Sequence, residues 1–356
     1  MGGLEDFVAN LAAQQLGRFA SVKVITLDRL FKDPEKVLPP HAEINGIEVK
    51  RIPYFGSSRY PIALSILKEL NGANLVHVHA VDFFFDALAL TRIWHRKPLV
   101  ATTHGGFFHT RNDALLKKIW FNTLTRFSAH QYRQIACCSE SDLRQFARIA
   151  PSRVSLIENG VDLKKFEGAS AKTPVRHLVT LGRMSGNKRL DRVLDVLACL
   201  DSGDQTWKLD IIGGESDLTV LDIEQMIVER SLDGKVSIHT GLNDEQVRAV
   251  LGNSSLFVSA SEYEGFGIAL IEAMSAGLVP VVHHNEAFRS FALRHEDITL
   301  ADFSLPEKTA ATIRSCFEKL SDRSGLRTNV ETASRGYGWP VAAQRYDHIY
   351  EQALGH

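Results

Sequence analysis

The sequence contains no uninterrupted apolar stretch of about 18 residues, the length needed for a membrane-spanning helix. Its N-terminus has neither the basic segment nor the apolar core of a secretory signal peptide. Only four cysteines are present, and they show neither metal-ligand spacing nor a disulfide framework: Cys137, Cys138, Cys199 and Cys316. These absences predict a cytoplasmic protein whose thiols stay reduced.

Two further patterns are missing. No Asp-x-Asp motif follows an expected strand, and no basic stripe with interleaved aromatic residues stands out. The second absence argues against a nucleic-acid partner. We therefore expect no bound metal, no cofactor and no nucleic acid.

Acidic and basic residues nearly balance over the 356 residues, but they are unevenly distributed. Residues 1–165 contain 22 lysines and arginines against 15 acidic residues, whereas the remainder contains 19 against 27. Segments 92–97 and 117–121 combine cations with tryptophan, as interfacial anchors do. One interpretation is peripheral contact with the anionic inner-membrane surface, and the other is a solvated helix face with a core tryptophan.

Length and an apolar fraction of 44% fit a soluble protein with two cores. Apolar, strand-like runs alternate with helical stretches, such as 190–200 and 244–251, along the whole chain. The expected strands are 22–26, 47–51, 75–78, 99–102, 134–138, 154–157, 178–181, 209–212, 236–239, 256–258 and 279–282. The alternation predicts an α/β fold of two doubly wound parallel sheets that face each other across a cleft.

Residues 259–277 join a strand end, a glycine turn and a helix. Gly265 and Gly267 allow a sharp turn and a close approach of ligand to backbone. The helix is expected at 268–276 with Gly277 as a left-handed cap, and its N-terminus favours a diphosphate. Glu264 precedes this helix and Glu272 lies within it, so they can contact opposite ends of one elongated ligand. The other interpretation is a junction whose carboxylates merely face solvent.

The spacing of Glu264 and Glu272 around Gly-Phe-Gly resembles the signature of retaining family-4 glycosyltransferases of the GT-B fold. The resemblance implies that Glu264 approaches the donor sugar and Glu272 accepts hydrogen bonds from the ribose hydroxyls. It places Gly265, Phe266 and Gly267 around the donor. The reaction it implies is hexose transfer from a nucleoside diphosphate sugar to an acceptor hydroxyl, with the departing phosphate taking the acceptor proton.

Other segments resemble the same family. Gly182 and Arg183 follow a strand, and Lys188 comes soon after; the resemblance implies that Arg183 and Lys188 neutralise the donor diphosphate. Each alone would be an ordinary surface cation. Gly213 follows another strand and is expected beside the nucleotide. Residues 158–162 resemble a structural turn in which Asn-Gly supplies positive φ.

In the first half, a strand ends at His104, onto which the resemblance places a donor contact. His79 ends another strand and either lines the acceptor cleft or, as we favour, serves as a core histidine. Relatives begin with a buried strand before a Gly-Gly loop, and this strand is missing here. Gly2 and Gly3 match the loop near the donor phosphate, and the apolar face of the next helix is expected to comprise Leu4, Phe7, Val8 and Leu11. We therefore expect the first sheet to be incomplete.

The resemblance also sets the domain boundaries. Residues 1–168 are expected to form an acceptor-side domain and 169–339 a nucleotide-sugar domain, joined by a charged linker at 165–173. A terminal helix at 340–356 is expected to return to the first domain. Such a fold closes around its substrates and excludes water from the reaction.

Residues 283–289 replace the small, glycine-rich loop of many relatives. They resemble bacterial exopolysaccharide mannosyltransferases, which use GDP-mannose and a polyprenyl-diphosphate-linked oligosaccharide. UDP-glucose or UDP-N-acetylglucosamine with a lipopolysaccharide-core acceptor stays open. Two other functions also stay open: a nucleotide-sugar 2-epimerase of the same architecture, and a truncated nucleotide-sugar binder without turnover.

Overall fold

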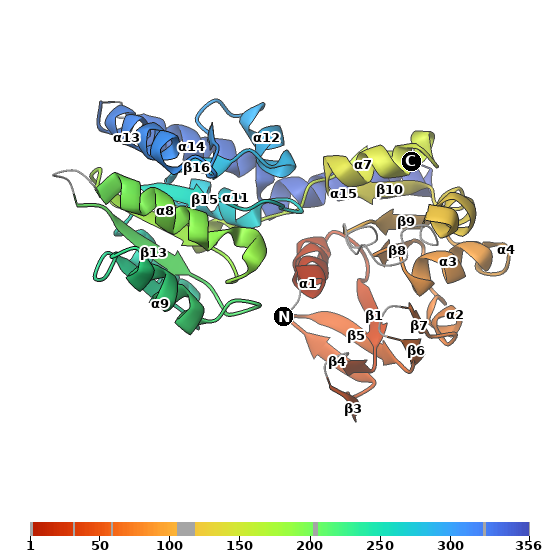
Figure 1. Ribbon diagram of the computed structural model, residues 1–356. Coiled ribbons are helices and arrows are strands. Elements are labelled where there is room, and N and C mark those ends of the chain that lie inside the picture. Colours follow the sequence, from red (N-terminus) through yellow and green to blue (C-terminus); the bar gives the residue numbers. More distant parts are fainter. Residues whose placement is uncertain are drawn as a thin grey trace. The chain divides into compact units, whose positions relative to one another are not determined.

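The computed structural model describes residues 3–30, 33–57, 60–104, 118–201, 206–322 and 325–355. The chain divides into two compact units (Figure 1). The first comprises Met1–Gly160 with Trp339–His356, and the second comprises Val161–Gly338. The second unit alternates strands with helices throughout, and the first does so from residue 66 onward, which confirms the predicted α/β class.

The first unit carries many short strands in addition to those expected. Its helices are α1 (Gly3–Gln15), α2 (Ile66–Glu69), α3 (Phe83–Leu90), α4 (Arg92–His95), a π-helix (Phe121–Thr125), α6 (Arg126–Ala129), α7 (Glu140–Ala147), a 3-10 turn (Pro151–Arg153) and α15 (Trp339–Leu354). Its strands are β1 (Lys23–Leu27), β2 (Arg29–Leu30), β3 (Asp33–Val37), β4 (His41–Ile44), β5 (Ile47–Ile52), β6 (Phe55–Ser57), β7 (Tyr60–Ile62), β8 (Val76–His79), β9 (Leu99–Thr102), β10 (Gln134–Cys137) and β11 (Val154–Leu156). Strands β2, β3, β4, β6 and β7 were not predicted, because they are short and form small antiparallel pairings.

The main strands of the first unit form two separate sheets. One has the order β11-β10-β9-β8 and is parallel, and the other has the order β1-β5-β4. In the described part of the chain, β1 and β8 each pair with a strand on one edge only. The main strands of the described part of this unit are therefore divided between two sheets, beside the small pairings β2-β3 and β6-β7. The face of β9 and β10 that carries Val100 and Ala136 packs against α1 and α15.

The second unit is a doubly wound, six-stranded parallel sheet of order β14-β13-β12-β15-β16-β17. Its strands are β12 (His177–Leu181), β13 (Lys208–Ile212), β14 (Val236–His239), β15 (Leu256–Ser259), β16 (Val279–His283) and β17 (Thr299–Ala301). Its helices are α8 (Leu190–Asp201), α9 (Val220–Glu229), α10 (Asp244–Leu251), α11 (Ile268–Ser275), α12 (Glu286–Ala292), α13 (Pro306–Asp322) and α14 (Leu326–Ser334), with 3-10 turns at Leu163–Lys165, Gly186–Lys188 and Arg335–Tyr337. Of these six strands, only β17 had not been predicted from the sequence.

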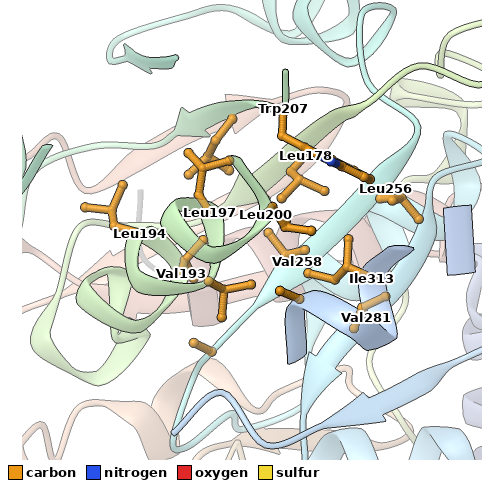
Figure 2. Packing of buried hydrophobic residues seen from close by; sticks show 14 of the residues in the cluster. Leu178, Val193, Leu194, Leu197, Leu200, Trp207, Leu256, Val258, Val281 and Ile313 are labelled. Atoms are coloured by element: carbon orange, nitrogen blue, oxygen red, sulfur yellow. The ribbon is translucent and has the colours of Figure 1, made fainter. Parts of the chain in front are cut away.

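Neighbouring residues along these strands face opposite layers of helices, as expected for strands buried on both faces. Leu256 and Val258 pack toward α8, α9 and α13, whereas Phe257 packs toward α10, α11 and α14. Figure 2 shows the first of these cores, with strand residues meeting α8 and α13: Leu178, Val193, Leu194, Leu197, Leu200, Trp207, Leu256, Val258, Val281 and Ile313. Because helices cover both faces of the sheet, a ligand is expected to bind at the loops that follow the carboxyl ends of the strands.

The segment 165–173, predicted as a linker, is instead part of the second unit. The backbone N–H groups of Gly168 and Ser170 donate to Ser275 and Ala276, and Phe166 is buried in the core. The chain changes unit after Gly160, earlier than the boundary placed at residue 168. Apolar burial and these backbone hydrogen bonds outweigh the polar, flexible composition that suggested a linker.

The Asn-Gly turn at residues 159 and 160 has a different physical basis from the one predicted. Neither Asn159 nor Gly160 has a positive φ. A Cβ on Gly160 would lie 2.4 Å from two carbons of the Trp339 ring. Glycine is required there because the first residue of α15 packs directly on the backbone.

Candidate nucleotide-sugar site

Two glycines lie back to back where β12 and β13 end. A Cβ on Gly213 would lie 1.9 Å from the carbonyl oxygen of Gly182, so the two backbones meet without room for a side chain. Gly182 has a φ of 136°, a conformation that favours glycine. The two predicted glycines are thus brought together, and they form a bare backbone surface at the carboxyl edge of the sheet.

Lys188 passes over this surface. A Cβ on Gly182 would lie 3.1 Å from Lys188 Cε and 3.2 Å from its Nζ. The ammonium group donates to Glu264 Oε1 at 2.7 Å, and the side chains of both residues are largely buried. The structure therefore joins two residues predicted for one site although 76 positions separate them. A cation and a carboxylate in contact can serve the diphosphate and the sugar of one donor.

A residue that the sequence analysis missed holds these two segments together. Asn187 Nδ2 donates to the carbonyl of Tyr263 at 2.8 Å, and Tyr263 N donates to Asn187 Oδ1 at 3.1 Å. The backbone of Glu262 also donates to the carbonyl of Asn187 at 3.0 Å. One side chain thus satisfies both backbone groups of the residue before Glu264. The spacing of residues in the sequence gives no sign of this pairing.

The next turn leads into α11 as predicted. Gly267 has a φ of 100° and precedes the helix, and no side chain caps the N-terminus within the described residues. Leu270 N donates to the carbonyl of Gly267, whereas the N–H groups of Ile268 and Ala269 make no hydrogen bond within the described residues and can meet an anion. Gly277 follows the helix with a φ of 83°, which confirms the predicted left-handed cap. A Cβ at Gly265 would meet open space, so no packing in the described structure requires a glycine there.

Phe266 points into the protein core. Its side chain is buried and packs near Phe291 and Tyr337. Only its backbone remains for a ligand. Phe266 thus anchors the turn so that Glu264 and Gly267 on either side keep their positions.

Glu272 lies on α11, one turn beyond the helix start. Burial raises the pKa of its carboxyl group, while Lys165 opposes this effect with its Nζ 3.9 Å from Oε1. The side chain keeps 21% of its surface exposed. A partly buried carboxylate whose cationic partner Lys165 lies as far away as 3.9 Å retains acceptor capacity for hydroxyl groups.

The remaining predicted residues are placed as follows. Arg183 directly follows Gly182 and is exposed, and in the described structure it forms no hydrogen bond or ion pair. Gly3 is the first residue of α1. Gly2 lies outside the described residues.

His104 belongs to a group of histidines in the first unit. It has a φ of 53°, and its Nε2 lies 3.1 Å from Nδ1 of His79. The ring of His77 lies 4.0 Å from that of His79 between centroids, and it is hydrogen-bonded to Tyr350 and to Thr102, both at 2.7 Å. Burial lowers the pKa of His104 to about 4 and that of His77 to about 3. These rings are neutral at pH 7, so His104 can exchange hydrogen bonds with sugar hydroxyls without adding charge.

We expect the first unit to lose stability on mild acidification. The unfolded chain protonates His77 near its ordinary pKa of 6.5, whereas the folded unit does so only near 3. Between these values the unfolded state binds more protons, so stability falls as the pH decreases. One histidine contributes about 1 kcal/mol for each pH unit below 6.5. The raised pKa of Asp82, about 6 because of burial, acts in the opposite direction.

Thermal unfolding at pH 7.5 and 5.5 measures this effect, and His77→Asn isolates it. The amide side chain cannot titrate, so the variant should lose less stability between the two pH values than the wild type. An equal pH dependence in both proteins would contradict the assignment.

Comparison with known proteins identifies the family. The family model "Glycosyltransferase Family 4" matches residues 1–165, and "Glycosyl transferases group 1" matches residues 163–333. The chain is also 41% identical, over its whole length and 94% of the relative, to a GDP-mannose:cellobiosyl-diphosphopolyprenol alpha-mannosyltransferase of Xanthomonas oryzae pv. oryzae. The chain belongs to glycosyltransferase family 4.

Other relatives and solved structures agree. A protein of the same name from Komagataeibacter xylinus is 37% identical over the whole chain and 91% of its own length. A glycosyltransferase from Rickettsia africae has a similar fold, with a TM-score of 0.76 at 16% identity over the whole chain and 96% of that structure. Anabaena HepE, solved with UDP and glucose, gives a TM-score of 0.72 at 17% identity over 98% of the chain and 96% of HepE. The two α/β units of this glycosyltransferase are those of the predicted GT-B fold.

Removing the Asn187 side chain should lower kcat of this glycosyltransferase about ten-fold or more. Without its two hydrogen bonds, the segment before Glu264 is free to shift, and small misplacements of reacting groups are costly. Steady-state kinetics of Asn187→Ala should show a larger change in kcat than in the donor KM. Asn253→Ala, which removes an exposed asparagine of the same unit, is the control. Equal kcat in both variants would assign Asn187 no positioning role.

Proposed function

We propose that this glycosyltransferase transfers mannose from GDP-mannose to a hydroxyl of a polyprenyl-diphosphate-linked oligosaccharide, with retention of anomeric configuration. The donor and acceptor classes follow from its relatives of 37–41% identity, whose names specify GDP-mannose and a cellobiosyl-diphosphopolyprenol. The main structural support for this proposal is the Lys188–Glu264 ion pair, which lies next to the glycines that follow β12 and β13.

In this reaction the bond between the sugar C1 and the β-phosphate oxygen of GDP breaks. A bond between C1 and the acceptor oxygen forms on the same face of the sugar. The acceptor proton passes to the departing phosphate, which leaves as GDP. The protein needs no dedicated base for this step, and its main task is to stabilise the charge that develops on the phosphate.

Different residues are assigned to the diphosphate, the sugar and the ribose of the donor according to their chemistry. Lys188 and Arg183 supply positive charge to the diphosphate, together with the free N–H groups of α11. Glu264 accepts hydrogen bonds from the sugar hydroxyls, and Glu272 accepts them from the ribose. His104, neutral and close to other histidines, is assigned to a donor hydroxyl.

A donor and acceptor panel tests the proposal. GDP-mannose, GDP-glucose, UDP-glucose and UDP-N-acetylglucosamine are each incubated with a short-chain prenyl-diphosphate cellobiose and without it. We expect product only from GDP-mannose with the acceptor, and an α-linkage in its NMR spectrum. Release of epimerised sugar without acceptor would indicate an epimerase. Donor binding without turnover would indicate a non-catalytic binder. Product from a UDP-sugar would overturn the donor assignment.

Glu272→Ala should weaken GDP binding about 10- to 100-fold and leave the fold intact. The expected size is that of hydrogen bonds to a charged group. Isothermal titration calorimetry with GDP measures the affinity. Glu224→Ala, which removes an exposed glutamate on α9, is the control. An unchanged GDP affinity in Glu272→Ala would remove the ribose role.

We further propose that the first unit contacts the membrane that holds the lipid-linked acceptor. Within the described residues, no helix is both long and apolar enough to cross a bilayer. At α4, however, Ile93 and Trp94 are 72% and 74% exposed, beside Arg92, Arg96 and Lys97. Exposed apolar side chains flanked by cations suit an anionic interface. Cosedimentation with phosphatidylglycerol vesicles should decrease in Trp94→Ala, and an unchanged bound fraction would exclude this surface.

A further inference from the structure

A group of potential metal ligands lies at the carboxyl edge of the six-stranded sheet of the second unit. His283 is the last residue of β16, His284 follows it, and Asp302 follows β17. One ligand atom from each residue lies within 4.8 Å of the others, and all three side chains are half-buried. The neighbouring parallel strands cause this proximity, because His283 pairs in register with Ala301.

The surrounding contacts orient these side chains. The N–H and the hydroxyl of Ser304 both donate to Asp302 Oδ1, at 3.0 and 2.6 Å, which directs the carboxylate and leaves Oδ2 available. The ring of Phe303 packs edge-on near His283. The rings of His283 and His284 lie 4.2 Å apart between centroids. Hydrogen bonds and packing around ligands of this kind are typical of metal sites.

We propose that His283, His284 and Asp302 bind a divalent transition-metal ion, for which Zn²⁺ is the probe. Two imidazole nitrogens and one carboxylate oxygen suit Zn²⁺ and its neighbours, whereas Mg²⁺ and Ca²⁺ prefer oxygen ligands throughout. Ligands within 4.8 Å of one another need only small side-chain rotations to reach bond distances of about 2 Å from a common centre.

The position of the site suggests that a bound ion would stabilise the segment next to the turn at Gly267. The three ligands bracket α12, whose N-cap Asn285 also donates to the carbonyl of Ser261 at 2.9 Å. Phe288 of α12 packs under Gly267, where a Cβ would lie 3.2 Å from its ring. A bound ion would fix both ends of the segment that supports the turn at Gly267. It would act by holding this segment in place.

Calorimetry and thermal unfolding of the full chain with ZnCl₂ test the site. We expect one ion per chain and a raised Tm. His284→Ala and Asp302→Asn should each weaken Zn²⁺ affinity about ten-fold or more, whereas His348→Ala, which removes an exposed histidine on α15, should not. Excess Mg²⁺ should not displace the ion.

The variants are compared in EDTA first, where equal Tm values show that the mutated chains fold. If His284→Ala is unstable, His284→Asn replaces it, since the amide retains a polar side chain of similar size. No saturable Zn²⁺ binding, or equal affinity in all variants, overturns the proposal. Because no donor or acceptor enters these measurements, their outcome is independent of the sugar-transfer assay.

Discussion

Lys188→Ala should lower turnover with GDP-mannose about 100-fold or more. The ammonium group lies over Gly182, at the carboxyl edge of the sheet where the donor diphosphate is assigned. Losing one preorganised group that faces developing charge costs turnover on this scale. Arg183→Ala should act in the same direction. The rate is measured with both GDP-mannose and acceptor at saturating concentrations, so that weaker donor binding does not account for the loss.

A matched control separates this role from the general loss of a cation. Lys308→Ala removes an exposed lysine of α13 in the same unit and should keep wild-type turnover. Lys188→Ala also leaves the Glu264 carboxylate without its 2.7 Å partner, so Tm is recorded for both variants. If Lys188→Ala and Lys308→Ala turn over equally, Lys188 is an ordinary surface cation.

Gly213→Ala should destabilise the second unit by about 1–3 kcal/mol, the usual cost of overpacking, and should reduce donor binding as well. Its Cβ would lie 1.9 Å from the carbonyl oxygen of Gly182 and 2.6 Å from its carbonyl carbon. Both obstacles are backbone atoms, so the ends of β12 and β13 must separate. The displaced strand end would carry Gly182 and Arg183 away from the donor.

The adjacent Gly214→Ala is the control for this substitution. Nothing lies within 4 Å of the Cβ at position 214, and its φ is outside the left-handed region. Both substitutions reduce the entropy of the unfolded chain equally, so their difference isolates the clash. Chemical denaturation and GDP titration compare them. Equal stability of the two variants would show that the strand ends separate at no cost.

Regular, local patterns were predictable from the sequence. The strand-to-helix junction that contains Glu264 and Gly267 was placed correctly, with α11 running from Ile268 to Ser275. Such a junction combines an apolar run, glycines and a helix period, all of which operate over a few residues. The wrong expectations concern weaker local patterns. The segment 165–173 has the composition of a linker, yet backbone hydrogen bonds to Ser275 and Ala276 place it in the second unit.

The sequence by itself determined the α/β class and the positions of the main strands along the chain, and it indicated the family through residues such as Glu264 and Glu272. It could not determine which distant groups meet, because contacts across a sheet depend on strand order and register. Only the tertiary structure placed Lys188 against Glu264, Asn187 against the backbone of Tyr263, and Gly213 against Gly182. These contacts follow from β12, β13 and β15 lying side by side as parallel strands, which brings loops far apart in sequence to one edge.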